Sequence, residues 1–366
     1  MTITFFSNFL NHHQLPLCEE FIKQIGEKNF HFVACEPIDL ERINMGYEDV
    51  NLKYSFVVRA YESQEQFNYA YRLACDSDIA IIGSALGLFA EIRAKYNKLT
   101  FLFRERIFKN SSWHRFIPTT AYTIYTGYIR YRNCNFYILC ASAYTAEDLE
   151  LCGFPRQKCL KWGYFPELLP KVEKKYDKLR IMWCGRMLWW KHPEDAVKVA
   201  RIIKNKSIDF EMKIIGNGEK REYIESLIDR YNLRSKVFTY NFMPPIEVRK
   251  IMNDSNVYLF TSGKQEGWGV VLNEAMNSGC AVIANINAGS THYLIENGIN
   301  GIMYDGTEKK LKEAVDTLLF MPISSVSKNA YNTISQIWNP EFAVKRLLTF
   351  ITNNFKPFGN GPCSLA

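Results

Sequence analysis

Three short polar segments follow predicted strands in the C-terminal half of this 366-residue chain. The first is Gly185-Arg186, which ends the apolar run Ile181 to Cys184 and lies five residues before Lys191. Arg offers a planar fork of donors to phosphate oxygens, and Lys offers a compact point charge. Both would stabilise the negative charge that grows on a departing diphosphate. The alternative interpretation of this pair is two solvated surface cations.

The other two segments are glycine turns. Gly216-Asn217-Gly218 is a weak signal, because glycine is the usual residue at any tight turn from strand to helix. Gly263 to Gly269 is a stronger one, because it opens a predicted helix and includes Glu266, with Glu274 one turn into that helix. Backbone N–H groups at a helix start attract phosphate or hydroxyl groups, and carboxylates accept hydroxyl hydrogen bonds. Acids at these two positions are also common in helices that have no functional site.

The elements that must position these residues alternate between short β-rich runs and amphipathic helical runs. This alternation predicts stacked βα units with a parallel sheet, in which ligands bind beyond the carboxyl ends of the strands. We expect helices to begin near Pro193, Glu219, Ile246, Gly269, Thr291 and Glu308. The strands predicted in the C-terminal half are Leu179–Gly185, Glu211–Gly216, Val237–Phe242, Val257–Ser262, Ala281–Asn285 and Gly301–Tyr304.

The N-terminal half repeats this pattern less clearly. A stretch with two prolines and several charges, Phe165 to Lys178, interrupts the alternation and predicts a domain boundary. We therefore expect one Rossmann-like domain over residues 1–168 and a second over 169–339, with a C-terminal segment, 340–366, packing back onto the first. The strands predicted in the N-terminal half are Ile3–Ser7, Phe30–Cys35, Phe56–Tyr61, Ile79–Gly83, Thr100–Phe103 and Tyr137–Ala141.

The segment from Glu266 to Gly279 resembles the E-x7-E segment of retaining GT-B glycosyltransferases of family 4, also called glycosyltransferase group 1. The resemblance extends from about Leu179 to Phe320 and includes the two cations, the turn at Gly216 and the segment Ala288 to Gly301, all in family order. It implies the GT-B fold, two Rossmann-like domains facing a cleft. It also implies a role in bacterial surface polysaccharide synthesis.

The resemblance implies a role for each matching residue. Arg186 and Lys191 would bind the donor diphosphate, Glu266 the hydroxyls of the transferred sugar, and Glu274 the nucleotide ribose. The family transfers sugars with retention, without a metal ion or other cofactor, and the donor phosphate itself receives the acceptor proton. The resemblance further implies that the backbone of Gly267, Trp268, Gly269 and Val270 assists donor binding, and that Asn217 and Met243 lie near the nucleoside.

The N-terminal half departs from the family, because its first strand is followed by Ser7 to Gln14 rather than by a glycine-rich turn. His13, in the tandem His12-His13, could contact phosphate or acceptor, or could be a surface residue at a helix start. Arg104 and Glu105 follow a predicted strand and are acceptor or phosphate candidates. Asp76-Ser77-Asp78 has the D-x-D pattern of a metal site but precedes its strand, so we interpret it as a solvated turn and predict no metal.

Composition excludes several classes of protein. Hydrophobic residues make up 47% and charged residues 23%, which is typical of a globular protein. The ten cysteines form no C-x-x-C pair, and the first residues read as a buried strand, so a cytoplasmic protein with reduced thiols is expected. No nucleic-acid-binding motif accompanies the net charge of +7, so nucleic acid is not an expected partner.

The excess positive charge is concentrated in residues 101–132, which contain six Lys or Arg and one acid. Nine aromatic residues lie in the same window, and Tyr122, Tyr125, Tyr128 and Tyr131 recur at every third position of a predicted helix. A basic, aromatic segment suits a lipid headgroup boundary, which predicts peripheral association with an anionic membrane surface. The alternative is that the tyrosines pack against the first sheet and the cations are merely solvated.

These observations together predict a glycosyltransferase that moves a sugar from a nucleotide diphosphate donor to a glycan or lipid-linked acceptor. The alternatives are a nucleotide-sugar epimerase of related fold and a nucleotide-sugar binding protein without turnover. The sugar, the nucleotide and the acceptor depend on loop contacts that the sequence does not specify.

Overall fold

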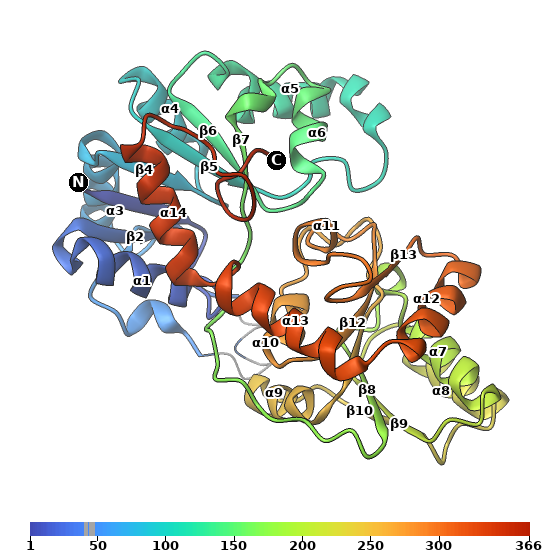
Figure 1. The fold of residues 1–366 in the computed structure, drawn as a ribbon. Helices are drawn as coiled ribbons and strands as arrows, with labels where there is room; N and C mark the ends of the chain where they lie inside the picture. Colours follow the sequence, from blue (N-terminus) through green and yellow to red (C-terminus); the bar gives the residue numbers. More distant parts are fainter. Residues whose placement is uncertain (40–42, 44–47) are drawn as a thin grey trace. The chain divides into compact units, whose positions relative to one another are not determined.

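The structure is a computed structural model that describes residues 1–39, 43 and 48–366. The chain divides into two compact units, an N-terminal unit of residues 1–167 with 339–366 and a C-terminal unit of residues 168–338. The division lies one residue from the predicted boundary at each crossing. Each unit is a parallel sheet with helices, which is the Rossmann-like architecture predicted for both halves (Figure 1).

The N-terminal sheet has the strand order β3-β2-β1-β4-β5-β6-β7, and all its strand pairs are parallel. Its central strands are buried on both faces, which explains why they read as continuous apolar runs rather than as alternating ones. Six of the strands agree with the predicted ones to within a few residues, and the short β7 was not predicted. The strands are β1 Ile3–Ser7, β2 Phe30–Ala34, β3 Val57–Arg59, β4 Ile79–Ile82, β5 Thr100–Arg104, β6 Phe136–Cys140 and β7 Cys159–Lys161.

The helices described in this unit are α1 Leu15–Ile25, α3 Gln64–Asp76, α4 Gly87–Lys95, α5 Pro118–Gly127, α6 Thr145–Glu150 and α14 Pro340–Thr352. They are joined by short 3-10 turns η1 Glu27–Asn29, η2 Val50–Leu52, η3 Ser112–Phe116, η4 Ile129–Tyr131 and η5 Arg156–Lys158. The helix α14 starts at a proline after Asn339, whose side chain accepts a hydrogen bond from the Phe342 N–H.

The C-terminal segment belongs to the N-terminal unit. The helix α14 lies beside α1, where the Gln24 amide donates to the Glu341 carbonyl at 3.3 Å (Figure 1). Beyond it, the tail runs antiparallel to β7 at Leu160 and Leu365, and the Lys161 N–H donates to the Ser364 carbonyl at 2.7 Å. The tail thereby pairs with a strand at the edge of the sheet, where unpaired backbone groups would otherwise remain.

The predicted run of tyrosines does not lie on one helix. The helix α5 ends at Gly127, and Tyr128 adopts a non-helical backbone conformation after it. Tyr131 follows in the turn η4, where its ring is buried against Phe136 at a centroid distance of 4.8 Å. Of the four tyrosines, Tyr122 and Tyr125 are the exposed ones, and both lie on α5. The prediction of one continuous helix was wrong because a three-residue spacing of tyrosines fits a 3-10 turn as well as an α-helix.

The C-terminal sheet has the strand order β10-β9-β8-β11-β12-β13, also parallel. All six strands lie where the sequence predicted them. The order reverses between β8 and β11, which is where open α/β sheets bind ligands. The strands are β8 Leu179–Cys184, β9 Phe210–Ile215, β10 Val237–Tyr240, β11 Val257–Phe260, β12 Ala281–Asn285 and β13 Ile302–Tyr304.

Six of the seven helices described in this unit begin within about two residues of the predicted positions, and the helix Ile323–Gln336 was not predicted. The seven are α7 Pro193–Asn205, α8 Arg221–Arg230, α9 Pro245–Asp254, α10 Val271–Asn277, α11 Thr291–Leu294, α12 Glu308–Phe320 and α13 Ile323–Gln336, with the 3-10 turn η6 Trp189–Lys191 before α7. None of the helices in the described part of the chain is both long enough and apolar enough to cross a bilayer.

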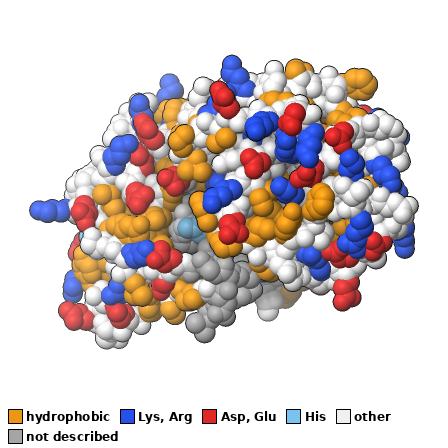
Figure 2. All heavy atoms as spheres, turned by 90° about the horizontal axis from the view of Figure 1, so that it is seen from below, with side chains coloured by type: hydrophobic (Ala, Val, Ile, Leu, Met, Phe, Trp, Pro, Cys, Tyr) orange, Lys and Arg blue, Asp and Glu red, His pale blue; other side chains and the backbone are white. Residues whose placement is uncertain are grey.

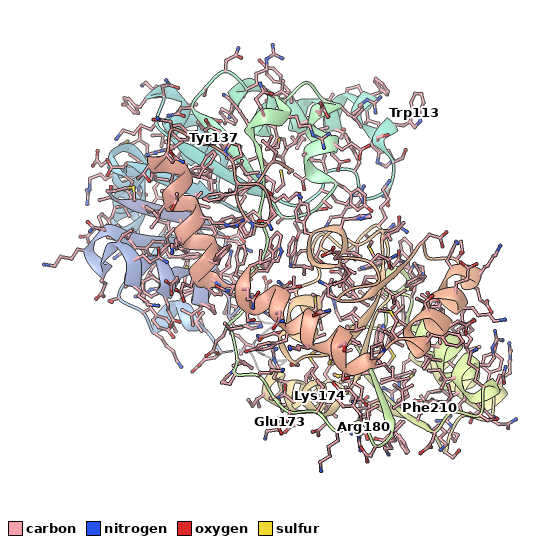
Figure 3. The ribbon with its side chains drawn as sticks, in the orientation of Figure 1. Trp113, Tyr137, Glu173, Lys174, Arg180 and Phe210 are labelled. Atoms are coloured by element: carbon pink, nitrogen blue, oxygen red, sulfur yellow. The ribbon has the colours of Figure 1, made fainter. Side chains whose placement is uncertain are left out.

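The segment that leads into the C-terminal unit is anchored by Lys174. Its ammonium group donates to the carbonyls of Met252 and Asn253, each at 2.9 Å, and of Ser255 at 2.5 Å. Figure 3 shows Lys174 next to α9, whose last carbonyls it satisfies. Burial lowers the pKa of this ammonium group. The charged stretch before β8 is therefore attached to its unit rather than being a free linker.

Arg93 ties β4 and β5 together at their amino ends. Its buried guanidinium donates to the carbonyls of Ala74, Ser77, Asp78 and Leu99, and to the Thr100 hydroxyl. Burial lowers its pKa to about 10, so it remains charged at neutral pH. A charged donor shared among several carbonyls satisfies backbone groups that neighbouring strands leave unpaired.

We predict that Arg93→Met lowers the free energy of unfolding by about 3 kcal/mol or more, because it leaves buried carbonyls without a donor. Lys95→Ala, at an exposed position of the same helix, should change it by less than about 0.5 kcal/mol. Urea unfolding followed by circular dichroism measures both. Equal stability of the two variants would contradict the role given to Arg93.

Candidate functional site

The loops after β8 and β9 form one backbone unit. The Gly185 N–H donates to the Ile215 carbonyl at 3.0 Å, and the Met187 N–H donates to the Asn217 carbonyl at 2.8 Å. Gly216 has a φ of +134°, and a Cβ there would lie 1.9 Å from the Gly185 oxygen. No residue with a side chain fits at this position without a backbone shift. The weak glycine-turn signal therefore marks a close approach of two loops at the carboxyl edge of the sheet.

Arg186 lies at the surface of the two joined loops after β8 and β9, which we call the double loop. Its side chain is exposed and forms no ion pair or hydrogen bond within the described part of the chain. The guanidinium is thus an exposed positive charge, and its backbone follows β8 directly after the contact between Gly185 and Gly216. Its five N–H donors are directed to solvent and can accept an anionic ligand.

Lys191 and Glu266, 75 residues apart in the sequence, form an ion pair with a direct hydrogen bond. Their side chains are only 16% and 17% exposed, so the pair is partly shielded from water. The Lys191 carbonyl also accepts from the Thr261 hydroxyl at 2.5 Å, and that hydroxyl accepts from the Trp183 indole N–H at 2.8 Å. The two charged residues predicted for the diphosphate and the sugar therefore meet at the switch point of the sheet.

The glycine-rich loop after β11 is fixed at both ends. The Gly263 N–H donates to the Trp190 carbonyl at 2.6 Å, and the Gly289 N–H donates to the Glu266 carbonyl at 3.3 Å. Gly269 has a φ of +81°, and a Cβ there would lie 2.4 Å from the Phe260 ring. The loop thus needs glycine for close packing against β11, and its geometry holds Glu266 toward Lys191.

Glu274 lies on α10 with Arg249 as its partner. The Arg249 guanidinium is 3.5 Å from the Glu274 carboxylate and also donates to the Glu274 carbonyl at 2.8 Å. Burial raises the pKa of Glu274, and the charge of Arg249 opposes this shift. The two acids of the E-x7-E segment are thus paired with different cations, Glu266 with Lys191 and Glu274 with Arg249.

Trp268 differs from the other residues predicted to contact the donor, because its side chain is 1% exposed. The indole N–H donates to Asn273 at 2.7 Å, and the ring lies 5.9 Å from that of Trp338. The Trp268 side chain therefore belongs to the core, and the backbone contact with the donor that the resemblance implies stays a prediction. Its large apolar ring is placed more favourably in the core than at a polar site.

Asn217 and Met243 follow the neighbouring strands β9 and β10. The Asn217 side chain is exposed, and its oxygen accepts from the Gly218 N–H at 2.8 Å, which leaves its amide donors outward. Met243 is half-buried in the loop before α9. Gly267 and Val270 are backbone positions of the loop that leads into α10.

The sequence analysis missed a charged cluster at the start of α7. His192 has a left-handed backbone, with φ +46° and ψ +53°, and its ring lies 3.4 Å from Glu194, which also accepts from Lys220 at 2.8 Å. Burial raises the pKa of Glu194, but these two hydrogen bonds outweigh it and hold the pKa at about 2. The cluster fixes the segment after Lys191 against α8. In the sequence, the signal for this cluster was His192 directly before Pro193, the proline that starts α7.

The N-terminal unit contains a polar pocket of about 520 Å³ at the carboxyl ends of β1, β4 and β5. Arg104 and Glu105 line it, as predicted for acceptor candidates. The Arg104 guanidinium is held by the carbonyls of Ile82, Gly83 and Phe103, and Glu105 lies 3.4 Å from the Tyr164 hydroxyl. The other polar lining residues, which we did not predict, are Ser7, Asn8, Asn11, Gln14, Ser84 and Tyr128.

His13 is half-buried between β1 and α1 and is not among the residues that line this pocket, although its neighbour Gln14 is. Its N–H donates to Asn11 at 3.0 Å. In the D-x-D segment, Asp78 accepts from the Thr2 N–H at 2.7 Å at the amino end of β4. That position is opposite to the edge where ligands bind, as expected for a turn rather than a metal site.

The C-terminal unit matches a known family of proteins. Residues 165–333 match the family described as glycosyl transferases group 1. The C-terminal unit carries a group 1 domain. Every residue of the Lys191–Glu266 pair, the double loop and α10 lies inside this domain. The match covers less than half of the chain.

Two relatives in sequence align with about two fifths of this chain. WcaL of Escherichia coli, assigned to colanic acid biosynthesis as a glycosyltransferase, is 30% identical over 153 residues, which are 39% of this chain and 38% of WcaL. AmsK of Erwinia amylovora, an amylovoran biosynthesis glycosyltransferase, is 29% identical over 158 residues, which are 41% and 39% of the two chains. The chain thus spans less than half the length of either relative.

Solved structures resemble the chain over both units. The lipopolysaccharide outer core galactosyltransferase WaaB aligns with a TM-score of 0.71 and 17% identity, over 97% of this chain and all of that one. HepE of Anabaena, in complex with UDP, aligns with a TM-score of 0.70 and 14% identity over 96% of this chain. At these identities the likeness concerns the fold, and it confirms the predicted class of two Rossmann-like domains alongside the group 1 domain.

We predict that Gly216→Ala destabilises the C-terminal unit by about 3 kcal/mol, because a methyl group would collide with the Gly185 carbonyl. Gly298→Ala is the matched control, since Gly298 has a similar left-handed φ of +82° but open space around it, and should cost only about 1 kcal/mol. Thermal unfolding of both variants measures the difference. Identical melting temperatures of the two variants would show that the loops after β8 and β9 can move apart without loss of stability.

Proposed function

We propose that the chain is a glycosyltransferase that moves a sugar, with retention of configuration, from a nucleotide diphosphate donor to a glycan or lipid-linked acceptor in polysaccharide synthesis. The observation that carries the proposal is the Lys191–Glu266 ion pair beside Arg186 at the switch point of the group 1 domain. Charged groups of both signs at this point match a substrate with a diphosphate at one end and hydroxyls at the other.

Each charged residue of the site has a proposed role in the reaction. Arg186 and Lys191 bind the donor diphosphate and stabilise its charge as the bond to the sugar breaks. Glu266 accepts hydrogen bonds from the sugar hydroxyls, and Lys191, now shared with the phosphate, keeps that carboxylate oriented. Glu274 binds the nucleotide ribose, with Arg249 preserving its charge. The reaction needs no protein nucleophile if the departing phosphate takes the acceptor proton.

The nucleotide is proposed to be uridine diphosphate, because the structure of HepE similar to this one contains UDP. The backbone of Gly267 to Val270 would approach the phosphates, and Asn217 and Met243 would flank the nucleoside. The acceptor is proposed to bind in the pocket of about 520 Å³ that Arg104 and Glu105 line. His13, which directly precedes the lining residue Gln14 in the sequence, is a further acceptor candidate. We further propose that transfer takes place in the cytoplasm at the inner face of the membrane. The epimerase and binding-protein alternatives gain no support from the comparisons.

We expect saturation-transfer NMR against UDP-, GDP- and ADP-sugars to select one nucleotide, and Glu274→Ala to weaken its binding about tenfold or more. Arg186→Ala, Lys191→Ala and Glu266→Ala should each lower nucleotide release during transfer by about a hundredfold or more. Glu247→Ala and Lys250→Ala, at exposed positions of α9, serve as charge-matched controls.

A double variant separates a catalytic pair from a structural one. If Lys191 and Glu266 only stabilise each other, Lys191→Met with Glu266→Gln should recover the activity that each single change loses, because no unpaired charge remains. The proposal requires the double variant to stay as inactive as the worse single one. Wild-type turnover by the three single variants would reject the site.

We also predict that transfer is independent of a divalent metal, because Arg186 and Lys191 supply the positive charge that a metal would otherwise bring to the diphosphate. Turnover should be unchanged in excess EDTA. Loss of turnover in EDTA with recovery on adding magnesium or manganese would contradict this prediction.

A further inference from the structure

A group of large side chains is exposed on the segment between β5 and β6. We call Trp113, Phe116, Ile117, Tyr122 and Tyr125 the aromatic face; their exposed fractions run from 46% for Ile117 to 75% for Trp113. They come from the consecutive elements η3 and α5 of the N-terminal unit. Figure 3 shows Trp113 pointing outward from its ribbon. Such a concentration of exposed apolar surface is unusual in a soluble protein and marks an interaction site.

The segment is firmly held beneath this face. Ile124 of α5 is 5% exposed and belongs to the hydrophobic core of the N-terminal unit, as does Ile129 after the helix. On α5 itself, the hydroxyls of Thr123 and Thr126 donate to the carbonyls of Thr119 and Tyr122, each at 2.9 Å. These hydroxyls can therefore leave water at little cost, since their hydrogen bonds are already made.

Several of the cations in residues 101–132 are held by other groups of the protein and do not face solvent freely. Arg104 is bound to three backbone carbonyls, Arg106 is buried 4.0 Å from Asp148, and Arg130 pairs with Glu91 at 2.6 Å. The outward cations of residues 101–132 are Arg132, which is exposed, Arg115, which is half-buried, and Lys109, which is exposed and lies 3.4 Å from Glu105. Figure 2 shows the molecule from below the view of Figure 1, where basic and acidic side chains are interspersed on the visible face.

We infer that the aromatic face inserts into the headgroup region of a phospholipid bilayer, and that rings contribute more to binding than charges do. Trp and Tyr favour this region because they combine an apolar ring with a polar tip. The Arg115 guanidinium lies over the Phe116 ring at 4.5 Å, which places one cation next to a ring, within reach of lipid phosphates when the ring is immersed.

Charge complementarity favours a bilayer over a protein as the occupant. Residues 106–132 contain no Asp or Glu, so no carboxylate of this segment would be brought against anionic headgroups. Each outward cation adds an attraction that salt screens over about 8 Å at physiological ionic strength, whereas ring insertion is insensitive to salt. Binding should therefore weaken in high salt but persist. The inference is independent of the donor site, since vesicle binding needs no turnover.

Flotation of the full chain with phosphatidylcholine vesicles containing roughly one third phosphatidylglycerol tests the inference. Trp113→Ser with Phe116→Ser should lower the partition coefficient about tenfold or more, whereas Lys109→Ser with Arg115→Ser should lower it only about twofold to fivefold. The control is Phe320→Ser with Tyr223→Ser, two exposed rings of the C-terminal unit at 90% and 49% exposure, which should bind as the wild type does.

Circular dichroism of each variant confirms folding, and an unchanged nucleotide affinity of the Trp113/Phe116 variant separates membrane binding from the proposed transfer. Two results would overturn the inference. One is wild-type chain that does not float with these vesicles, which would leave the face to a protein partner. The other is binding abolished by the charge variant but unaffected by the ring variant.

Discussion

The contact between Gly216 and the Gly185 carbonyl is the constraint on which the candidate site depends. It joins the loops after β8 and β9 so closely that a Cβ on Gly216 would lie 1.9 Å from the Gly185 oxygen. Arg186 and Asn217, the residues that follow each glycine, are consequently held at fixed positions on one edge of the sheet. The next elements, the turn η6 and the start of α7, are then positioned by the same double loop through the Met187 hydrogen bond.

The charges of the site are arranged as local pairs. Lys191 is matched by Glu266, Glu274 by Arg249, and Glu194 by Lys220 and His192. Each pair lowers the cost of keeping a charged group partly out of water before a ligand arrives. Arg186 is the exception within the described residues, since its guanidinium is exposed and unpaired. An incoming anion would meet this group without having to displace a protein partner.

Much of the fold could be predicted because parallel strands buried on both faces leave long apolar runs such as Ile79–Ile82. The strand β7 was missed; it is an edge strand, and one of its partners is a tail about 200 residues away in sequence. The meeting of Lys191 with Glu266 followed from both lying after strands at the same sheet edge. Burial was not predictable from residue type alone, so neither the packing of the Trp268 ring into the core nor the burial of Arg106 beside Asp148 was predicted.

The route of the chain also determines the order in which the two units can be completed during synthesis. The C-terminal unit is continuous, and all its strands emerge from the ribosome before residue 339. The N-terminal unit needs α14 to cover α1 and the tail to pair with β7, and these are translated after the whole C-terminal unit. The half of the protein that is made first is therefore the half that finishes folding last, with a helix face and a strand edge open until then.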